Sequence, residues 1–283
     1  STLFPYTTLF RSYMIGLSAT IPHNLQFYFK IKYKARIVSC DIVEAIEDDV
    51  LPEPKILLLP LQLDNTNPTE EYVINPKGKG EIHVPYRERW QYKKQKIRKV
   101  IVHCTPYQRH LEWNSLIDWE KNRYLGSHNP VLEKVWLHHC GQRLEFLAKC
   151  KISIVKEILK ILKNYRTITF CKTIEHCEQL GSNCIHSKNS NSTKVYEDFN
   201  KKKVKHITAV NILNENANLV DCKYAIFANY SSSEVVMPQR IGRSLRHKSP
   251  VIIMPFFKGT REEEIVIKML KDYDKSYIDN KLC

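Results

Sequence analysis

Residues 238–247, with the sequence PQRIGRSLRH, carry the side chains best suited to chemistry. In a helix, positions three and four apart share a face, and this spacing gathers one glycine and three polar residues. These residues are Gln239, Gly242, Arg243 and Arg246. Arginine offers forked donors that match phosphate oxygens, and glycine lets a ligand or a backbone approach closely. The segment therefore predicts a phosphate-binding site.

A larger fold must position this segment, and the chain from residue 166 onward predicts one. Short strands rich in β-branched residues alternate with helical segments. The expected strands are 167–171, 183–186, 206–210, 224–228 and 251–257. This alternation predicts an α/β fold whose parallel sheet is covered by helices on both faces.

The first half of the chain predicts a different mixture of elements. Residues 65–80 are polar and rich in proline and glycine, which favours a loop. Thr105 and Pro106 are a typical cap and first residue of a helix. The other elements expected upstream are helices at 41–48, 105–123 and 144–162 and a strand at 55–63.

The pattern Q-R-x-G-R-x-x-R at 239–246 resembles motif VI of the superfamily 2 helicases and translocases. Further stretches resemble other motifs of that family in the expected order: GLSATIP (16–22) motif III, 166–180 motif IV and 209–221 motif V. The resemblance is strongest to phage-encoded DEAD/DEAH-type DNA helicases. It implies two RecA-like lobes that clamp ATP and Mg²⁺ between them, with nucleic acid lying across both lobes.

The resemblance also implies roles for single residues. Arg243 and Arg246 match the arginine fingers, and Gln239 matches the residue on the γ-phosphate side. The implied nucleotide-binding set is Gln239, Gly242, Arg243, Arg246, Asn216 and Asn218. The implied contacts with nucleic acid are Ser18, Thr20, Cys171, Lys172 and Asn211.

Motif V departs from the usual pattern of the family at three positions. Asn211, Asn216 and Asn218 stand where the family usually has Thr, Gly and Asp. Asparagine tolerates the left-handed backbone region better than most residues, so Asn216 can keep the turn. Asn218 could still form a hydrogen bond to a ribose hydroxyl, but its neutral amide lacks the charge that the carboxylate of the usual Asp would add to this bond.

The order of the motifs predicts the domain organisation. Residues 13–50 are expected to be a remnant of a first RecA-like lobe, and 51–283 a second lobe with a helical insertion at about 65–164. Residues 1–12 back-translate to a standard sequencing-adapter oligonucleotide, so we expect them to be foreign to the protein. The chain contains no Walker A or Walker B motif, and the Gly-Lys-Gly at 78–80 lacks the spacing of a phosphate loop. ATP and Mg²⁺ would then be bound mainly by a missing first lobe, and the chain alone should not hydrolyse ATP.

The run at 86–100, YRERWQYKKQKIRKV, allows two interpretations. In the first, its cations bind phosphates while Tyr86, Trp90 and Tyr92 stack on bases. In the second, the aromatic rings pack on the protein and the charges face water. The cations chosen as candidates are Arg87, Arg89, Lys93 and Lys94. Trp113, Trp119 and Trp136 are expected in the core or between helices.

Composition favours an intracellular protein that binds a polyanion. The 283 residues carry 44 Lys and Arg against 30 Asp and Glu, a net charge of +14. This predicts nucleic acid as a partner, with DNA favoured over RNA, and no membrane span is expected. His138, His139 and Cys140 lack a second ligand pair, so no metal site is expected. The location we expect is the cytoplasm of a bacterial host. The oligomeric state is left open, as are two alternative functions: a nucleic-acid-binding module without ATPase activity, and the motor of a restriction or remodelling enzyme.

Overall fold

The computed structural model of the chain describes residues 23–34, 36, 42–94, 98–210, 219–231, 240–242 and 247–279. The chain divides into two compact units, residues 1–39 and 40–283. In the first unit, α1 (His23–Tyr33) is a helix that the sequence did not predict. Its side chains Phe27 and Ile31 are exposed. Across the described residues, no helix combines the length and apolar character that spanning a membrane requires.

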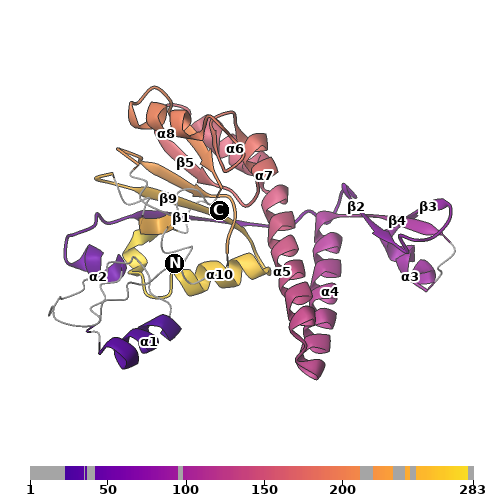
Figure 1. Ribbon diagram of the computed structural model, residues 1–283. Helices are drawn as coiled ribbons and strands as arrows, with labels where there is room; N and C mark the ends of the chain where they lie inside the picture. Colours follow the sequence, from indigo (N-terminus) through magenta and orange to yellow (C-terminus); the bar gives the residue numbers. More distant parts are fainter. Residues whose placement is uncertain are drawn as a thin grey trace. The chain divides into compact units, whose positions relative to one another are not determined.

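The second unit contains a seven-stranded sheet in which all neighbouring strands run parallel (Figure 1). The strand order across the sheet is β10-β1-β9-β8-β5-β7-β6. The strands are β1 (Lys55–Leu61), β5 (Thr167–Phe170), β6 (Cys184–Ile185), β7 (His206–Ala209), β8 (Tyr224–Phe227), β9 (Val251–Phe257) and β10 (Ile278–Asp279). The predicted α/β fold with a parallel sheet is confirmed, and β10 is the one strand of this sheet that the sequence did not predict.

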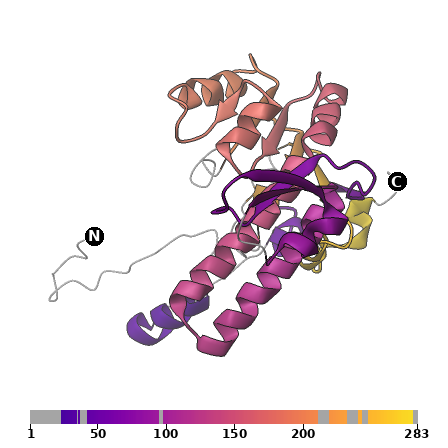
Figure 2. The same cartoon turned by 90° about the vertical axis from the view of Figure 1, so that its right-hand side faces the viewer.

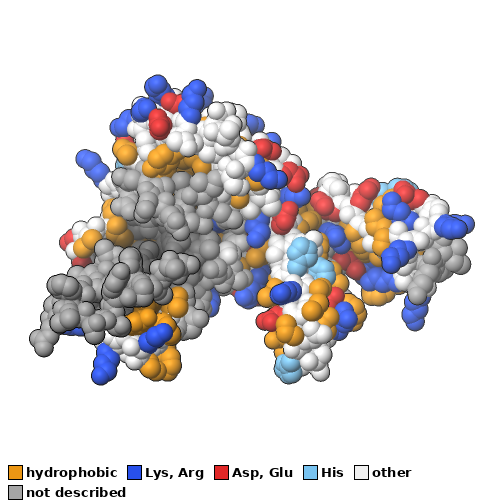
Figure 3. All heavy atoms as spheres, viewed as in Figure 1, with side chains coloured by type: hydrophobic (Ala, Val, Ile, Leu, Met, Phe, Trp, Pro, Cys, Tyr) orange, Lys and Arg blue, Asp and Glu red, His pale blue; other side chains and the backbone are white. Residues whose placement is uncertain are grey.

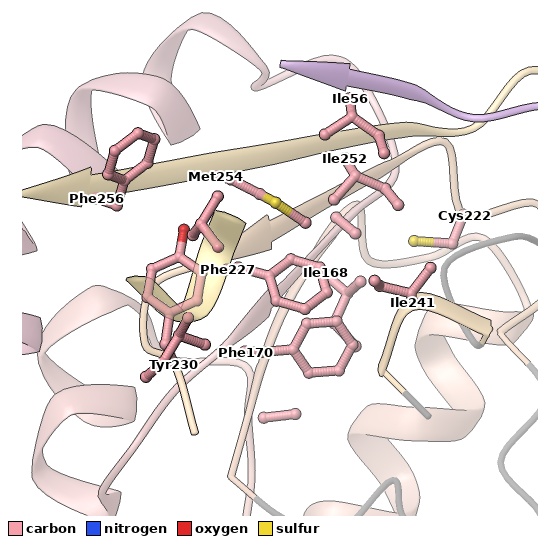
Figure 4. Close-up of a cluster of buried hydrophobic side chains, with 14 of the residues drawn as sticks. Ile56, Ile168, Phe170, Cys222, Phe227, Tyr230, Ile241, Ile252, Met254 and Phe256 are labelled. Atoms are coloured by element: carbon pink, nitrogen blue, oxygen red, sulfur yellow. The ribbon is translucent and has the colours of Figure 1, made fainter. Parts of the chain in front are cut away.

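Side chains alternate between the two faces of this sheet, so each face has its own core. Ile252, Met254 and Phe227 belong to the larger core, which Figure 4 shows in close-up. Their neighbours Ile226 and Ile253 point to the smaller one. Helices that cover the larger core are α2 (Ile42–Glu47), α8 (Ser192–Asn200), α10 (Arg261–Met269) and the end of α5 (Pro130–Cys150). Those that cover the smaller core are α6 (Ile152–Ile161) and α7 (Ile174–Leu180).

The segment expected as a helical insertion also contains a sheet. Its strands are β2 (Glu70–Ile74), β3 (Glu81–Pro85) and β4 (Lys99–Cys104), in the order β2-β4-β3. β2 runs antiparallel and β3 parallel to the central β4. One face of this sheet buries Tyr72, Val84 and Val102 against Tyr86 and Tyr92. The loop predicted at 65–80 contains β2, so that prediction was wrong for these residues, and β3 and β4 were not predicted. The strands are short, and proline, glycine and charged residues separate them.

Two long helices form the rest of the insertion, α4 (Pro106–Ser127) and α5, which lie side by side as a hairpin (Figures 1 and 2). Thr105 caps α4 as predicted: Gln108 N donates to Thr105 Oγ1 (3.2 Å), and Thr105 N donates to Gln108 Oε1 (3.0 Å). The helix ends at His128, in the left-handed region (φ 49°), and Asn129 caps α5. The bounds predicted for the helix at 144–162 are therefore wrong. The helix α5 begins at Pro130 and ends at Cys150, and Lys151 separates it from α6.

Lys151 lies between α5 and α6, and its side chain is buried against the large sheet. Its Nζ lies 2.6 Å from Glu262 Oε1 and 3.2 Å from the carbonyl of Pro255, and both charged side chains are fully buried. Phe257 N also donates to Glu262 Oε2 (3.3 Å). Burial lowers the pKa of Lys151 and raises the pKa of Glu262. This ion pair joins the end of the insertion to β9 and to the first turn of α10.

Two buried histidines predict that the second unit loses stability in acid. Burial lowers the pKa of His110 to about 4 and that of His176 to about 4, from a usual 6.5. Between these values the unfolded chain binds more protons than the folded one, so the free energy of unfolding falls as pH falls from about 6.5 to about 4. At about pH 5 the loss is about 2 kcal/mol for each histidine.

Urea unfolding at several pH values checks this prediction. His176→Leu should remove the contribution of this histidine, about 2 kcal/mol at about pH 5. His138→Leu, which replaces an exposed imidazole on α5, should leave that dependence in place. An acid dependence that His176→Leu does not change would show that this histidine is not responsible.

Candidate nucleotide and nucleic-acid sites

The candidate site lies where parallel strands of the large sheet end, and the structure describes part of it. Residues 240–242 form a helical turn, and Gly242 on it is half-buried. The other predicted residues of the nucleotide site lie outside the described residues: Gln239, Arg243, Arg246, Asn216 and Asn218. The same holds for three predicted contacts with nucleic acid: Ser18, Thr20 and Asn211.

Arg240 attaches this helical turn to the sheet. Its side chain is 5% exposed, and Nη1 donates to the backbone oxygen (3.5 Å) and Oδ1 (3.4 Å) of Asn229, just beyond β8. The guanidinium also lies 5.3 Å from the ring centre of Phe170, at the end of β5. Burial lowers the pKa of Arg240 to about 10, so the group keeps its charge at neutral pH.

Sequence reasoning missed Arg240, although the spacing contained the signal. Arg240 and its neighbour Ile241 are both buried, and Ile241 packs in the larger core (Figure 4). On a helix, positions 239, 242, 243 and 246 fall on the side opposite these two residues. The same helical spacing that groups the candidate phosphate-binding residues on one face therefore also predicts which residues, on the opposite face, pack against the core.

Cys171 does not fit its predicted role as a contact with nucleic acid. Its side chain is fully buried in the smaller core, beside Cys177 of α7. Its backbone N–H is also used, because it donates to the carbonyl of Ala209 (2.8 Å). The cause is the alternation of side chains along β5: Phe170 faces the larger core, so the next residue faces the smaller one.

Lys172, the next residue, lies where the sequence placed it, at the carboxyl end of β5. It is half-buried and precedes Thr173, the residue that caps α7 by accepting a hydrogen bond from His176 N. Lys172 forms no ion pair with any residue that the structure describes. Its charge is therefore available to a ligand at this edge of the sheet.

The basic run at 86–100 contains cations that are paired with Glu112 and cations that are exposed to solvent. Arg89 Nε lies 2.6 Å and Lys93 Nζ 3.2 Å from carboxylate oxygens of Glu112 on α4, and the Arg89 side chain is 11% exposed. Arg87 is 86% exposed, with its Nε 3.6 Å from Glu88 Oε1, and Lys94 is exposed as well. As phosphate contacts, Arg87 and Lys94 remain suitable. Arg89 does not, because its charge is neutralised inside the protein.

The aromatic residues of the same run also divide. Tyr86 and Tyr92 pack on the small sheet, as the second interpretation held. Trp90 is 59% exposed, as the first interpretation needs, with Lys93 Nζ 3.8 Å from its ring centre. On α4, Trp119 is 55% exposed, so the expectation of a buried position for it was wrong. Each interpretation therefore describes part of the segment.

Comparison with known protein families gives a match to one part of the chain. Residues 150–248 match the model of the helicase conserved C-terminal domain. The match begins at the end of α5 and covers β5 to β8, the helical turn at 240–242 and the Q-R-x-G-R-x-x-R pattern. Over these residues the chain is similar to the helicase conserved C-terminal domain. No curated protein matches the chain.

The solved structures to which the chain is similar are distant in sequence. S. cerevisiae Dbp5 bound to RNA and ADP BeF3 is 14% identical, with a TM-score of 0.40 and coverage of 47% of this chain and 38% of that one. The Pyrococcus furiosus Hef helicase domain is 16% identical, with a TM-score of 0.33 and coverage of 58% and 40%. The Mycobacterium smegmatis helicase Lhr bound to ssDNA and AMP-PNP is 15% identical, with a TM-score of 0.33 and coverage of 38% and 17%. The chain thus spans less than half of each of these proteins.

Proposed function

We propose that this chain provides the second RecA-like lobe of an ATP-dependent superfamily 2 helicase or translocase. The observation that carries the proposal is the match of residues 150–248 to the helicase conserved C-terminal domain. The matched region ends on the pattern whose spacing suits phosphate groups. The net charge of +14 supports nucleic acid as the polymer, and we favour DNA.

In this proposal Arg243 and Arg246 act as arginine fingers, and Gln239 contacts the γ-phosphate side of ATP. When bound with Mg²⁺, ATP supplies the phosphoryl group that is transferred to water. The arginines neutralise charge on the phosphate oxygens, and Gly242 leaves room for close approach. The buried anchors Arg240 and Ile241 support this arrangement, because a helix that continues from this turn directs the other four positions away from the core.

The remaining predicted residues take supporting roles in the proposal. Asn216 and Asn218 would meet the nucleotide, with the amide of Asn218 bonding a ribose hydroxyl. The proposed contacts with the nucleic acid are Lys172, Ser18, Thr20 and Asn211. We also propose that this chain by itself does not hydrolyse ATP, because half of a nucleotide site cannot preorganise the phosphates.

Measurement of ATP hydrolysis with and without DNA tests the proposal. The complete protein encoded by the gene should hydrolyse ATP and turn over faster when DNA or RNA is added. This chain alone should bind nucleic acid and show no turnover. A complete protein that binds nucleic acid without hydrolysing ATP would instead support the non-catalytic binding module. ATP-dependent cleavage of DNA would support the motor of a restriction enzyme.

A further inference from the structure

A groove of about 490 Å³ lies in the insertion, between β2 and α4 and away from the nucleotide site. Its lining combines aromatic rings with cations: Tyr72, Trp113, Trp119, Lys93 and Arg109. This combination differs from an ordinary apolar groove, because the rings can stack on flat groups while the cations attract negative charge. The proposed helicase function does not use these residues.

Arg109 is held between two of the rings. Its Cζ lies 4.6 Å from the ring centre of Tyr72 and 4.6 Å from that of Trp113. Among the described residues no carboxylate comes within ion-pair distance of it. Burial lowers the pKa of Arg109, which shows that its charge is costly where it lies. An anionic ligand would offset this cost.

Two rings of the lining carry polar atoms without partners. Tyr72 Oη and Trp113 Nε1 are buried, and neither has a hydrogen-bond partner within the part of the chain that the structure describes. A buried polar group left without a partner costs about 1–3 kcal/mol.

Two exposed tryptophans lie beside cations: Trp119 is part of the lining, and Trp90 lies beside Lys93 of the lining. Trp119 has the Arg123 guanidinium 4.5 Å from its ring centre, and Trp90 has Lys93 Nζ 3.8 Å from its ring centre. The one carboxylate in the lining, Glu112, is neutralised by Arg89 and Lys93.

The surroundings add to this positive charge. Between residues 65 and 150 the chain has fifteen Lys and Arg against nine Asp and Glu. Lys and Arg side chains lie beside apolar ones over α3 (Arg89–Tyr92) and β2–β4 (Figure 3). The charge of this region therefore complements a polyanion rather than a neutral partner.

We propose that this groove binds single-stranded nucleic acid. Bases stack on the exposed rings of Trp119 and Trp90, while Arg109, which forms no ion pair with a described residue, attracts the phosphates. Duplex should bind more weakly, because its bases are already stacked on one another and unavailable to the rings. The inference rests on the proposed function for the class of ligand, and it adds a second contact outside the RecA-like sheet.

Fluorescence anisotropy with labelled oligothymidylate, oligouridylate and a DNA duplex tests the groove in this chain. Trp119→Ala should weaken binding of single strands about tenfold, because one stacking contact is lost. Arg109→Gln should weaken binding and make it less dependent on salt between about 50 and 200 mM. The matched controls are Leu137→Ala, an exposed apolar residue of α5, and Arg261→Gln, a partly exposed cation of α10. Both controls should bind as the wild type does, and the melting temperature of each variant shows that it is folded.

The outcomes separate this inference from the proposed function. Wild-type affinity for single strands in both Trp119→Ala and Arg109→Gln would overturn the groove while leaving the helicase proposal standing. Equal or tighter binding of duplex would also overturn it, and so would a chain that binds no nucleic acid. If the two variants lose affinity while the complete protein hydrolyses no ATP, the groove stands and the helicase proposal fails. Preference between the DNA and RNA strands identifies the polymer.

Discussion

Replacing Lys151 with methionine is expected to lower the free energy of unfolding by about 3–5 kcal/mol. The change leaves the Glu262 carboxylate fully buried, with its charge uncompensated and only the 3.3 Å hydrogen bond from Phe257 N. Removing one partner of a buried pair costs far more than losing an exposed ion pair, because the remaining charge has no access to water. Urea unfolding followed by circular dichroism measures the effect.

Two comparisons make this result specific. Lys149→Met removes a lysine two residues away that is partly exposed and paired with Glu145 and Glu175, and it should cost less than about 1 kcal/mol. The double replacement Lys151→Met with Glu262→Leu should recover much of the lost stability, since no charge is then left buried. A double variant less stable than Lys151→Met alone would contradict the account of an uncompensated charge.

Replacing Arg243 with alanine is expected to lower kcat for ATP hydrolysis by the complete protein by about 10³-fold or more. In the proposed function this side chain neutralises charge that develops on the phosphate oxygens in the transition state. An interaction made mainly in the transition state lowers kcat when it is removed, and the affinity for nucleic acid should change little. Steady-state hydrolysis with saturating nucleic acid, together with anisotropy for binding, separates these effects.

The control for Arg243→Ala is Lys248→Ala, which removes an exposed cation five residues further along the chain. This variant should keep wild-type turnover, because the proposed role requires the Arg243 guanidinium at the phosphates and not simply a positive charge nearby in the sequence. Arg243→Lys should stay close to the alanine variant, since lysine cannot provide the forked donors. Turnover of Arg243→Ala within a few fold of the wild type would contradict the assignment.

Some features of the chain follow from local patterns and were predicted from sequence. The β-branched segments from residue 166 onward became the parallel strands β5 to β9, because alternation with helices requires crossovers that leave strands parallel. Thr105 and Gln108 formed the expected cap of α4, since such a cap involves residues only three apart. Of the Q-R-x-G-R-x-x-R pattern, the structure describes residues 240–242, which form a helical turn.

Other features were decided by partners far away in the sequence. Lys151 and Glu262 are 111 positions apart, and no local pattern pairs them or predicts that both are buried. Arg89 looked like a free cation in a basic run until α4 brought Glu112 to it. Cys171 fell on the buried side of β5, where a motif position had suggested a surface contact.

The sequence by itself therefore determined the class of fold, the order of the main elements and the candidate phosphate-binding residues. These depend on short-range periodicity and on residue types that a single segment displays. The tertiary structure decided which charges are neutralised, which aromatic rings stay exposed and where a groove forms between β2 and α4. Those properties depend on the packing of distant segments, because solvent exposure and charge compensation are set by neighbours in space and not by neighbours along the chain.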